Sequence, residues 1–184
     1  MDDLTVIQKC NAGQTEAFGH LVRKYQSEAI GHAVAILGNL EDARDAVQDA
    51  FLDAYRTLKT FDPSRKFYPW LYTILRNHCF KMLASRRKEP ATGTGKTEIL
   101  SQPTEGTSSI DVNIVEKALR EMTPEDRELL TLKYLDGLHY DELAERLGVP
   151  LGTIMSRLYY ARGRFREKVV RFQERLDSGE IDNE

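Results

Sequence analysis

The stretch LHYDELAERLGVPLGTIMSRLYYARGRFR, residues 138–166, decides how the C-terminal part of the chain folds. Ala144 is small enough for a crossing of two helices, Gly148 can adopt the positive φ of a tight turn, and Ile154 supplies an apolar plug between the helices. The inward stripe at helical spacing comprises Leu143, Leu147, Ile154, Leu158 and Ala161. Together these features predict a helix-turn-helix.

The outward face of the second helix is polar, basic and aromatic. Its residues near the helix N-terminus are Thr153, Met155, Ser156, Arg157, Tyr159, Tyr160 and Arg162. Hydroxyls and guanidiniums at the start of such a helix suit entry into a DNA major groove, where they meet base edges and phosphates. The alternative interpretation is an ordinary helical hairpin inside an all-α domain.

Charge is distributed unevenly around this motif, although the net charge of the chain is only −3. Residues 151–176 hold seven Lys and Arg against two acids, whereas residues 111–150 hold five bases against ten acids. A basic helix can release counterions from DNA phosphates, and an acidic flank is better suited to a protein partner. The charge pattern therefore favours binding to both DNA and protein.

Composition excludes several classes of protein. With 41% hydrophobic and 30% charged residues, the 184-residue chain is typical of an ordered, soluble protein of one or two domains. No apolar run approaches the about 20 residues that cross a bilayer, and the N-terminus lacks a signal peptide, so we expect the chain in the cytoplasm. Its two cysteines and four histidines are scattered, so the sequence indicates no disulfide, metal site or cofactor.

The clearest helix of the N-terminal half is EDARDAVQDAFLDAYRTL, residues 41–58, with Asn39 and Asp42 as a predicted N-cap pair. Its apolar positions repeat every three or four residues: Ala43, Ala46, Val47, Ala50, Phe51, Ala54, Tyr55 and Leu58. The opposite face is more acidic than solvent exposure alone requires. We interpret it as either a solvated surface or a binding surface.

A further helix, predicted for residues 67–88 with Pro69 in its first turn, combines aromatic and basic residues. Its aromatics include Phe67, Tyr68, Trp70, Tyr72 and Phe80, and the nearby bases are Arg65, Lys66, Arg76, Lys81, Arg86, Arg87 and Lys88. Aromatics at helical spacing are usually core, which is the simpler interpretation of Trp70. Interleaved with bases, they can also stack on unpaired nucleotides beside a phosphate-tracking groove, and Asn77 can read the edge of an extruded base.

The expected fold is all-α, with two small helical domains, residues 1–88 and 112–177, joined by a flexible linker and followed by an acidic tail, residues 178–184. The linker, residues 89–111, is rich in Gly, Ser, Thr and Pro. Its Gly93-Thr94-Gly95-Lys96-Thr97 segment resembles part of a phosphate-binding loop. The first glycine of that pattern is absent, however, and no strand is predicted before it, so nucleotide binding is not expected.

Each domain contains further predicted helices. In the first, residues 4–37 should form two helices separated at Ala12-Gly13. In the second, residues 112–121 should be helical, and Thr123 should cap a helix that precedes the helix-turn-helix. The buried side of that capped helix is predicted to carry Leu129, Leu130, Leu132 and Tyr134. The last helix should continue to about Leu176.

Three segments of the chain resemble the extracytoplasmic-function sigma factors of bacteria, the smallest members of the sigma-70 family. DARDAVQDAFLDAYRTL, residues 42–58, resembles their region 2.2, and FDPSRKFYPWLYTILRN, residues 61–77, resembles region 2.3 leading into region 2.4. Residues 130–167, which include the helix-turn-helix, resemble region 4. The order, the spacing and the linker match as well, so the resemblance covers nearly the whole chain.

The resemblance implies a promoter-specificity subunit without catalytic activity, which binds promoter DNA and core RNA polymerase, the latter through the β′ clamp helices and the β flap. The implied contacts to the β′ clamp helices are Asp45, Gln48, Asp49 and Phe51. The implied residues for melting and capture of the −10 element are Arg65, Lys66, Phe67, Tyr68, Trp70 and Asn77, with Arg86, Arg87 and Lys88 on upstream phosphates. The implied −35 readers are Thr153, Met155, Ser156, Arg157, Tyr159, Tyr160 and Arg162.

The family typically answers to an anti-sigma factor, often membrane-anchored, which covers these same surfaces. Met155 and Tyr160 stand where the family often has a basic residue, so we expect fewer phosphate or guanine contacts and a different −35 preference. Two other functions are kept as alternatives. One is a stand-alone helix-turn-helix regulator that binds duplex DNA without polymerase, and the other is an enzyme that uses the Gly95-Lys96-Thr97 segment on nucleotides.

Overall fold

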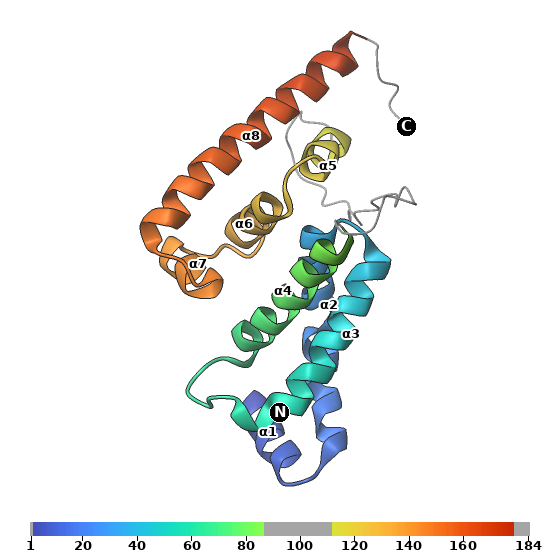
Figure 1. Cartoon of the computed structure of the whole chain (residues 1–184), viewed down its shortest axis with the longest axis vertical. Helices are drawn as coiled ribbons and strands as arrows, with labels where there is room; N and C mark the ends of the chain where they lie inside the picture. Colours follow the sequence, from blue (N-terminus) through green and yellow to red (C-terminus); the bar gives the residue numbers. More distant parts are fainter. Residues whose placement is uncertain (1, 87–111, 179–184) are drawn as a thin grey trace. The chain divides into compact units, whose positions relative to one another are not determined.

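The structure is a computed structural model that describes residues 2–86 and 112–178 (Figure 1). The chain divides into two compact units, unit 1 within residues 1–96 and unit 2 within residues 97–184. Over the described residues it forms α-helices and two short 3₁₀ helices, without strands. The prediction of an all-α fold is confirmed. The predicted linker, residues 89–111, lies outside the described residues.

Unit 1 is a bundle in which α2, α3 and α4 pack against one another and α1 packs on α2 (Figure 1). Its elements are α1 (Asp3–Asn11), η1 (Thr15–Ala17), α2 (Phe18–Leu37), α3 (Leu40–Thr57), η2 (Leu58–Thr60) and α4 (Phe67–Arg86). The loop of residues 61–66 therefore leads directly into α4, the helix that carries the predicted −10 residues.

Helix ends in unit 1 follow from local sequence. The break predicted at Ala12-Gly13 is confirmed, and Gly13 adopts a φ of 95° that other residues rarely tolerate. α2 ends at Gly38, whose φ is 80°. The predicted cap of α3 is confirmed as well, because the Asn39 side chain accepts a hydrogen bond from the Asp42 backbone N–H at 2.9 Å.

The core of unit 1 combines small residues on α3 with large ones on its neighbours. Alanines recur along the inward face of α3 and are fully buried: Ala43, Ala46, Ala50 and Ala54. Large, fully buried side chains come from α2 and α4: Leu21, Ile36, Leu71, Tyr72 and Leu75. Small residues on one helix let the other two approach closely, so the packing fixes α4 in place relative to α3.

Unit 2 is organised by its long last helix, on which the three preceding helices pack (Figure 1). Its elements are α5 (Val112–Arg120), α6 (Pro124–Tyr134), α7 (Tyr140–Leu147) and α8 (Leu151–Asp177). The predicted Thr123 cap is present, with the Asp126 backbone N–H donating to Thr123 Oγ1 at 3.3 Å. The C-terminal half of α8 covers α5 through a cluster of Ile114, Ala118 and Phe172, flanked by Phe165, Val169 and Leu176.

One core assignment in unit 2 is wrong. Leu129, Leu130 and Leu132 are buried as predicted, but Tyr134 is 57% exposed. Tyr134 is the last residue of α6, at the point where the helix gives way to the connection to α7.

No helix within residues 2–86 and 112–178 is long and apolar enough to cross a membrane. The same residues contain no cluster of three His, Cys, Asp or Glu side chains that could hold a metal ion.

Candidate nucleic-acid and partner interfaces

The start of α4 is built on a buried aromatic ring, that of Phe67. Its ring centroid lies 5.7 Å from that of Tyr25, 5.9 Å from that of Phe61 and 5.7 Å from that of Trp70. Phe67 is only 2% exposed, and the next residue, Tyr68, is 6% exposed. These two predicted DNA contacts therefore lie in the core, where they support their neighbours.

The exposed predicted residues of this region lie on either side of that buried turn. Arg65 and Lys66 are exposed in the loop before α4, and Asn77 is exposed in the middle of α4. Trp70 is half-buried, with one edge packed on Phe61 at a centroid distance of 5.2 Å. The core interpretation of Trp70 is thus correct for part of the ring. The rest of the ring is accessible to solvent, and the exposed Arg65 and Lys66 precede it by only a few residues.

The C-terminal half of α4 is tied to α3 by polar contacts that the sequence did not suggest. His78 Nε2 lies 2.9 Å from Asp53 Oδ2, and Arg86 pairs with Asp42. Hydrogen bonds from Arg56 and then from His78 lower the pKa of the Asp53 carboxyl below its ordinary value. Arg86, one of the three predicted phosphate contacts, is therefore engaged within unit 1. Arg87 and Lys88 lie outside the described residues.

The acidic face of α3 is confirmed as exposed, with Asp45, Gln48 and Asp49 open to solvent. Phe51, the fourth predicted contact, is buried and forms part of the wall of a groove between α2 and α3. The groove has a volume of about 830 Å³ and a mainly apolar lining. Its lining includes Phe18, Val22, Ile30, Val47, Phe51, Leu52 and Tyr55.

Sequence reasoning missed two apolar residues at this groove. Leu52 is 46% exposed, although it was not among the candidate contacts, and Tyr55 is 37% exposed, although its helical position predicted burial. The signal for Leu52 was its place in the sequence, because a leucine on the polar side of an otherwise regular amphipathic helix indicates a binding surface. The exposure of Tyr55 depends on how far α2 covers α3, which no local sequence pattern reveals.

In unit 2 the predicted helix-turn-helix is confirmed. Gly148 ends α7 with a φ of 66°, and the Val149 backbone N–H donates to the Ala144 carbonyl at 3.1 Å. Leu143, Ile154, Leu158 and Ala161 of the predicted inward stripe are fully buried, whereas Leu147 is partly exposed. The second helix of the motif is the first half of α8.

The predicted outward residues of α8 lie around the part of the helix surface that the buried stripe leaves exposed. Exposed residues are Met155, Ser156, Arg157, Tyr159, Tyr160 and Arg162, and Thr153 is half-buried. The Tyr159 and Tyr160 rings meet edge to face at a centroid distance of 5.4 Å. With Arg162 and Arg166 they border a shallow hollow of about 600 Å³ on the helix surface. A surface of hydroxyls, aromatic rings and guanidiniums on the second helix of a helix-turn-helix has the chemistry needed to bind duplex DNA.

Other bases of α8 serve the fold of unit 2. Arg164 makes a two-point contact with the Asp126 carboxylate, with Nε at 2.7 Å and Nη2 at 2.8 Å. Lys168 and Arg171 both pair with Glu121. The Asp126 carboxylate raises the pKa of the Arg164 guanidinium above its ordinary value. The basic character of α8 is thus divided between a structural side and the exposed side.

Loss of Arg164 should destabilise unit 2 more than loss of the Asp126 charge. Arg164→Met leaves the buried Asp126 carboxylate without its two charged hydrogen bonds, which should lower the free energy of unfolding by about 2–3 kcal/mol. Asp126→Asn keeps an acceptor beside a half-exposed guanidinium and should cost about 1 kcal/mol. Urea unfolding followed by circular dichroism measures both losses. A larger loss for Asp126→Asn would contradict the assignment.

A second exposed apolar surface lies where α6 leads into α7. Leu135 is 81% exposed, and it follows the exposed Tyr134. Tyr140 lies at the start of α7 with the Lys133 ammonium 5.0 Å from its ring centroid, and Lys133 also donates to the Leu138 carbonyl at 2.9 Å. An ordered connection that displays large apolar side chains is typical of a protein-binding surface. We call Tyr134, Leu135 and Tyr140 the α6–α7 patch.

Comparison with known proteins matches each unit to a separate family model. Residues 21–89 match Sigma-70 region 2, and residues 113–165 match Sigma-70, region 4. The RNA polymerase sigma-H factor of Pseudomonas aeruginosa is 32% identical over 174 residues, which is 87% of this chain and 90% of that protein. The ECF RNA polymerase sigma-E factor of Escherichia coli K12 is 31% identical over 182 residues, with 92% and 95% of the two chains covered.

Two solved structures are also similar to this chain over most of its length. The sigma factor RpoE of Bartonella quintana, in complex with the anti-sigma factor NepR, is 27% identical with a TM-score of 0.67, covering 83% of this chain and 96% of that one. CnrH in complex with the cytosolic domain of CnrY is 25% identical with a TM-score of 0.62, covering 90% and 95%.

Proposed function

Since the chain belongs to the extracytoplasmic-function sigma factors of the sigma-70 family, we propose that it binds core RNA polymerase and directs it to promoters through the −10 and −35 elements. The observation that carries the proposal is the presence of two different exposed surfaces on two units. One combines a half-buried tryptophan with bases and an amide, which suits separated strands, and the other is a helix-turn-helix, which suits duplex DNA. Few other functions require both.

The proposed domains are residues 1–88 for polymerase binding and the −10 element, and residues 112–177 for the −35 element. Residues 89–111 are the proposed linker and residues 178–184 the acidic tail. The division agrees with the family models, each of which falls within one of the two domains apart from a single residue.

The proposed docking surface for the β′ clamp helices is the exposed face of α3 with its groove. Asp45 and Asp49 lie one helical turn apart, and Leu52 continues the same ridge beside the groove. An acidic ridge next to an apolar hollow suits an amphipathic helix with basic residues. Gln48 borders the groove directly, and Phe51 acts as its wall.

The proposed −10 surface consists of direct contacts and their supports. Arg65, Lys66, Trp70 and Asn77 are exposed or partly exposed, so they are the proposed direct contacts. Phe67 and Tyr68 are proposed to hold these residues in position from the core. Arg87 and Lys88 remain proposed phosphate contacts, and Arg86 joins them only if its pairing with Asp42 opens.

The proposed −35 surface is the exposed face of α8, formed by Thr153, Met155, Ser156, Arg157, Tyr159, Tyr160 and Arg162. Arg157→Ala should lower the affinity of holoenzyme for a promoter with an intact −35 element by about tenfold, because one good base contact contributes about 1–3 kcal/mol. Arg175→Ala, a change of an exposed arginine five turns further along α8, should have little effect. Gel-shift titration measures both, and equal losses would contradict the assignment.

The α6–α7 patch is the proposed contact for the β flap. Its apolar side chains are exposed at the end of α6 and the start of α7. They precede the DNA-reading residues of α8 in the sequence and are distinct from them. This arrangement leaves separate residues for polymerase and for DNA within one small unit.

We also propose that an anti-sigma factor regulates the protein by covering these surfaces in the cytoplasm. The solved structure of RpoE from Bartonella quintana is a complex with the anti-sigma factor NepR, and that of CnrH is a complex with the cytosolic domain of CnrY. The chain itself is proposed to have no catalytic residue and no cofactor, and to act on transcription only through core polymerase. Any attachment to a membrane would come from the partner.

Run-off transcription with core polymerase and the purified protein tests the function. We expect promoter-dependent initiation that neither core polymerase nor the protein gives alone. Absence of such initiation on the promoters that respond to overexpression would refute the proposal. Tight binding of the free protein to duplex operators would favour the stand-alone regulator instead.

A further inference from the structure

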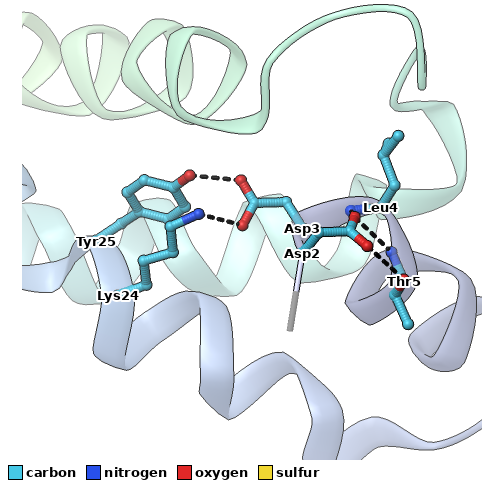
Figure 2. Close-up of polar contacts among 6 residues, drawn as sticks. All are labelled: Asp2, Asp3, Leu4, Thr5, Lys24 and Tyr25. Carbon is cyan, nitrogen blue, oxygen red and sulfur yellow. Dashed lines mark hydrogen bonds and ion pairs between the residues drawn. The ribbon is translucent and has the colours of Figure 1, made fainter.

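The first turn of α1 holds a side chain of α2 through Asp3. The Asp3 carboxylate accepts a hydrogen bond from the Tyr25 hydroxyl at 2.5 Å and one from the Lys24 ammonium at 2.6 Å (Figure 2). The adjacent Asp2 points away toward Leu4 and Thr5, and caps α1 by accepting from their backbone N–H groups (Figure 2). The two neighbouring carboxylates therefore have separate roles, one within α1 and one between α1 and α2.

The ring of Tyr25 links this contact to the start of α4. It stacks on Tyr68 at a centroid distance of 5.1 Å and an interplanar angle of 29°. It also lies 5.7 Å from the ring of Phe67. The hydroxyl of Tyr68 is within 2.7 Å of Nδ1 of the buried His32. The first turn of α4 is thus held from α2 by Tyr25 on one side and His32 on the other.

The position of this turn controls the residues proposed to act on the −10 element. Phe67 and Tyr68 directly follow Arg65 and Lys66, and Phe67 packs on Trp70. A small rotation or shift of this turn would move Arg65, Lys66 and Trp70 as well, because helix geometry couples consecutive residues. The orientation of Tyr25 depends in turn on Asp3, since a half-buried hydroxyl requires an acceptor in a fixed place.

We propose that Asp3 and Tyr25 are positioning residues for promoter opening: the hydrogen bond between them fixes the aromatic stack that supports the start of α4. This inference rests on the proposed function, in which the start of α4 engages the separated strand. It assigns to α1 a role in opening, although α1 lies outside both matched regions. The matched region 2 begins at residue 21, so Tyr25 is inside it and Asp3 is not.

The test is the rate of open-complex formation by full-length protein with core polymerase, followed by a fluorescent base in the −10 element. Tyr25→Phe keeps the stacked ring and removes only the hydroxyl, and Asp3→Ala removes the acceptor. Each should open a duplex promoter about fivefold more slowly than wild type, whereas binding to a premelted promoter should change less than about twofold. The double variant should be no slower than the slower single variant, because both changes remove the same contact.

Lys24→Met is the matched control. It removes the ion pair to the same carboxylate and the ammonium that lies 4.7 Å from the Tyr25 ring centroid, but leaves the hydrogen bond between Tyr25 and Asp3. The Lys24 side chain is half-exposed, so these contacts contribute little and opening should proceed at close to the wild-type rate. Three results would overturn the inference and leave the proposed function standing. They are equal losses on duplex and premelted promoters, additive losses in the double variant, and wild-type opening by Tyr25→Phe. A wild-type holoenzyme that opens no promoter would overturn the proposed function and the inference with it.

Discussion

Leu52→Asp is expected to weaken binding to core RNA polymerase by about 30-fold or more, while the protein remains folded. The side chain of Leu52 is nearly half-exposed on the groove between α2 and α3, so a carboxylate is well solvated in the free protein. In the complex the same carboxylate would be buried at the apolar groove, against the apolar side of the partner helix and away from the basic residues proposed to face Asp45 and Asp49. The cost therefore falls on the bound state and not on the fold.

The control for this experiment is Val170→Asp, which introduces the same charge at a similarly exposed apolar residue on α8. Fluorescence titration of labelled protein with core polymerase gives both affinities, and circular dichroism verifies folding. Asp49→Arg, a change on the neighbouring acidic ridge, should also weaken binding while altering the free energy of unfolding by no more than about 0.5 kcal/mol. If Leu52→Asp binds core polymerase as wild type does, the groove is not the docking surface.

Asn77→Ala is expected to reduce opening by about 10- to 100-fold on promoters that carry the preferred base at one position of the −10 element. The amide is exposed in the middle of α4, where it can donate and accept toward an extruded base. Promoters with another base at that position should lose much less, because they lack the matching hydrogen bonds in wild type as well.

Thr73→Ala is the matched control for Asn77→Ala. Thr73 is exposed one turn earlier on α4, and its hydroxyl donates to the Pro69 carbonyl at 3.1 Å within the helix. Its replacement should leave the preference among −10 variants unchanged. A panel of promoters that differ by single −10 bases, assayed for open complexes, measures the preference. A uniform loss across the panel with Asn77→Ala would contradict base reading by this side chain.

The candidate −10 residues show how far sequence patterns can predict a site. The pattern placed Phe67, Tyr68 and Trp70 on one aromatic helix, and the structure confirms that helix. It could not separate the buried rings from the accessible one, because burial depends on which residues of α2 and of the loop before α4 cover each ring. Phe67 and Tyr68 pack on Tyr25, which is more than 40 positions earlier in the chain. A local sequence pattern carries no information about contacts between residues so far apart in sequence.

Charge patterns have a similar limit. Both the basic excess of residues 151–176 and the acidic face of α3 are present in the structure. Counting charges could not show that Arg164, Lys168 and Arg171 are paired with Asp126 and Glu121, which belong to a different part of unit 2. It also could not show that Arg86 is paired with Asp42 on α3.

The sequence by itself determined the all-α fold, the helix caps at Asn39 and Thr123, and the helix-turn-helix with its glycine turn. These features depend on backbone preferences and on periodicities within a few residues, so the local sequence is sufficient to specify them. Only the tertiary structure decided which rings and charges remain accessible, that Leu52 and Tyr55 face a groove, and that Asp3 reaches Tyr25. Those properties arise when helices distant in sequence pack together, because burial and ion pairing are set by the surface that each helix presents to its neighbours.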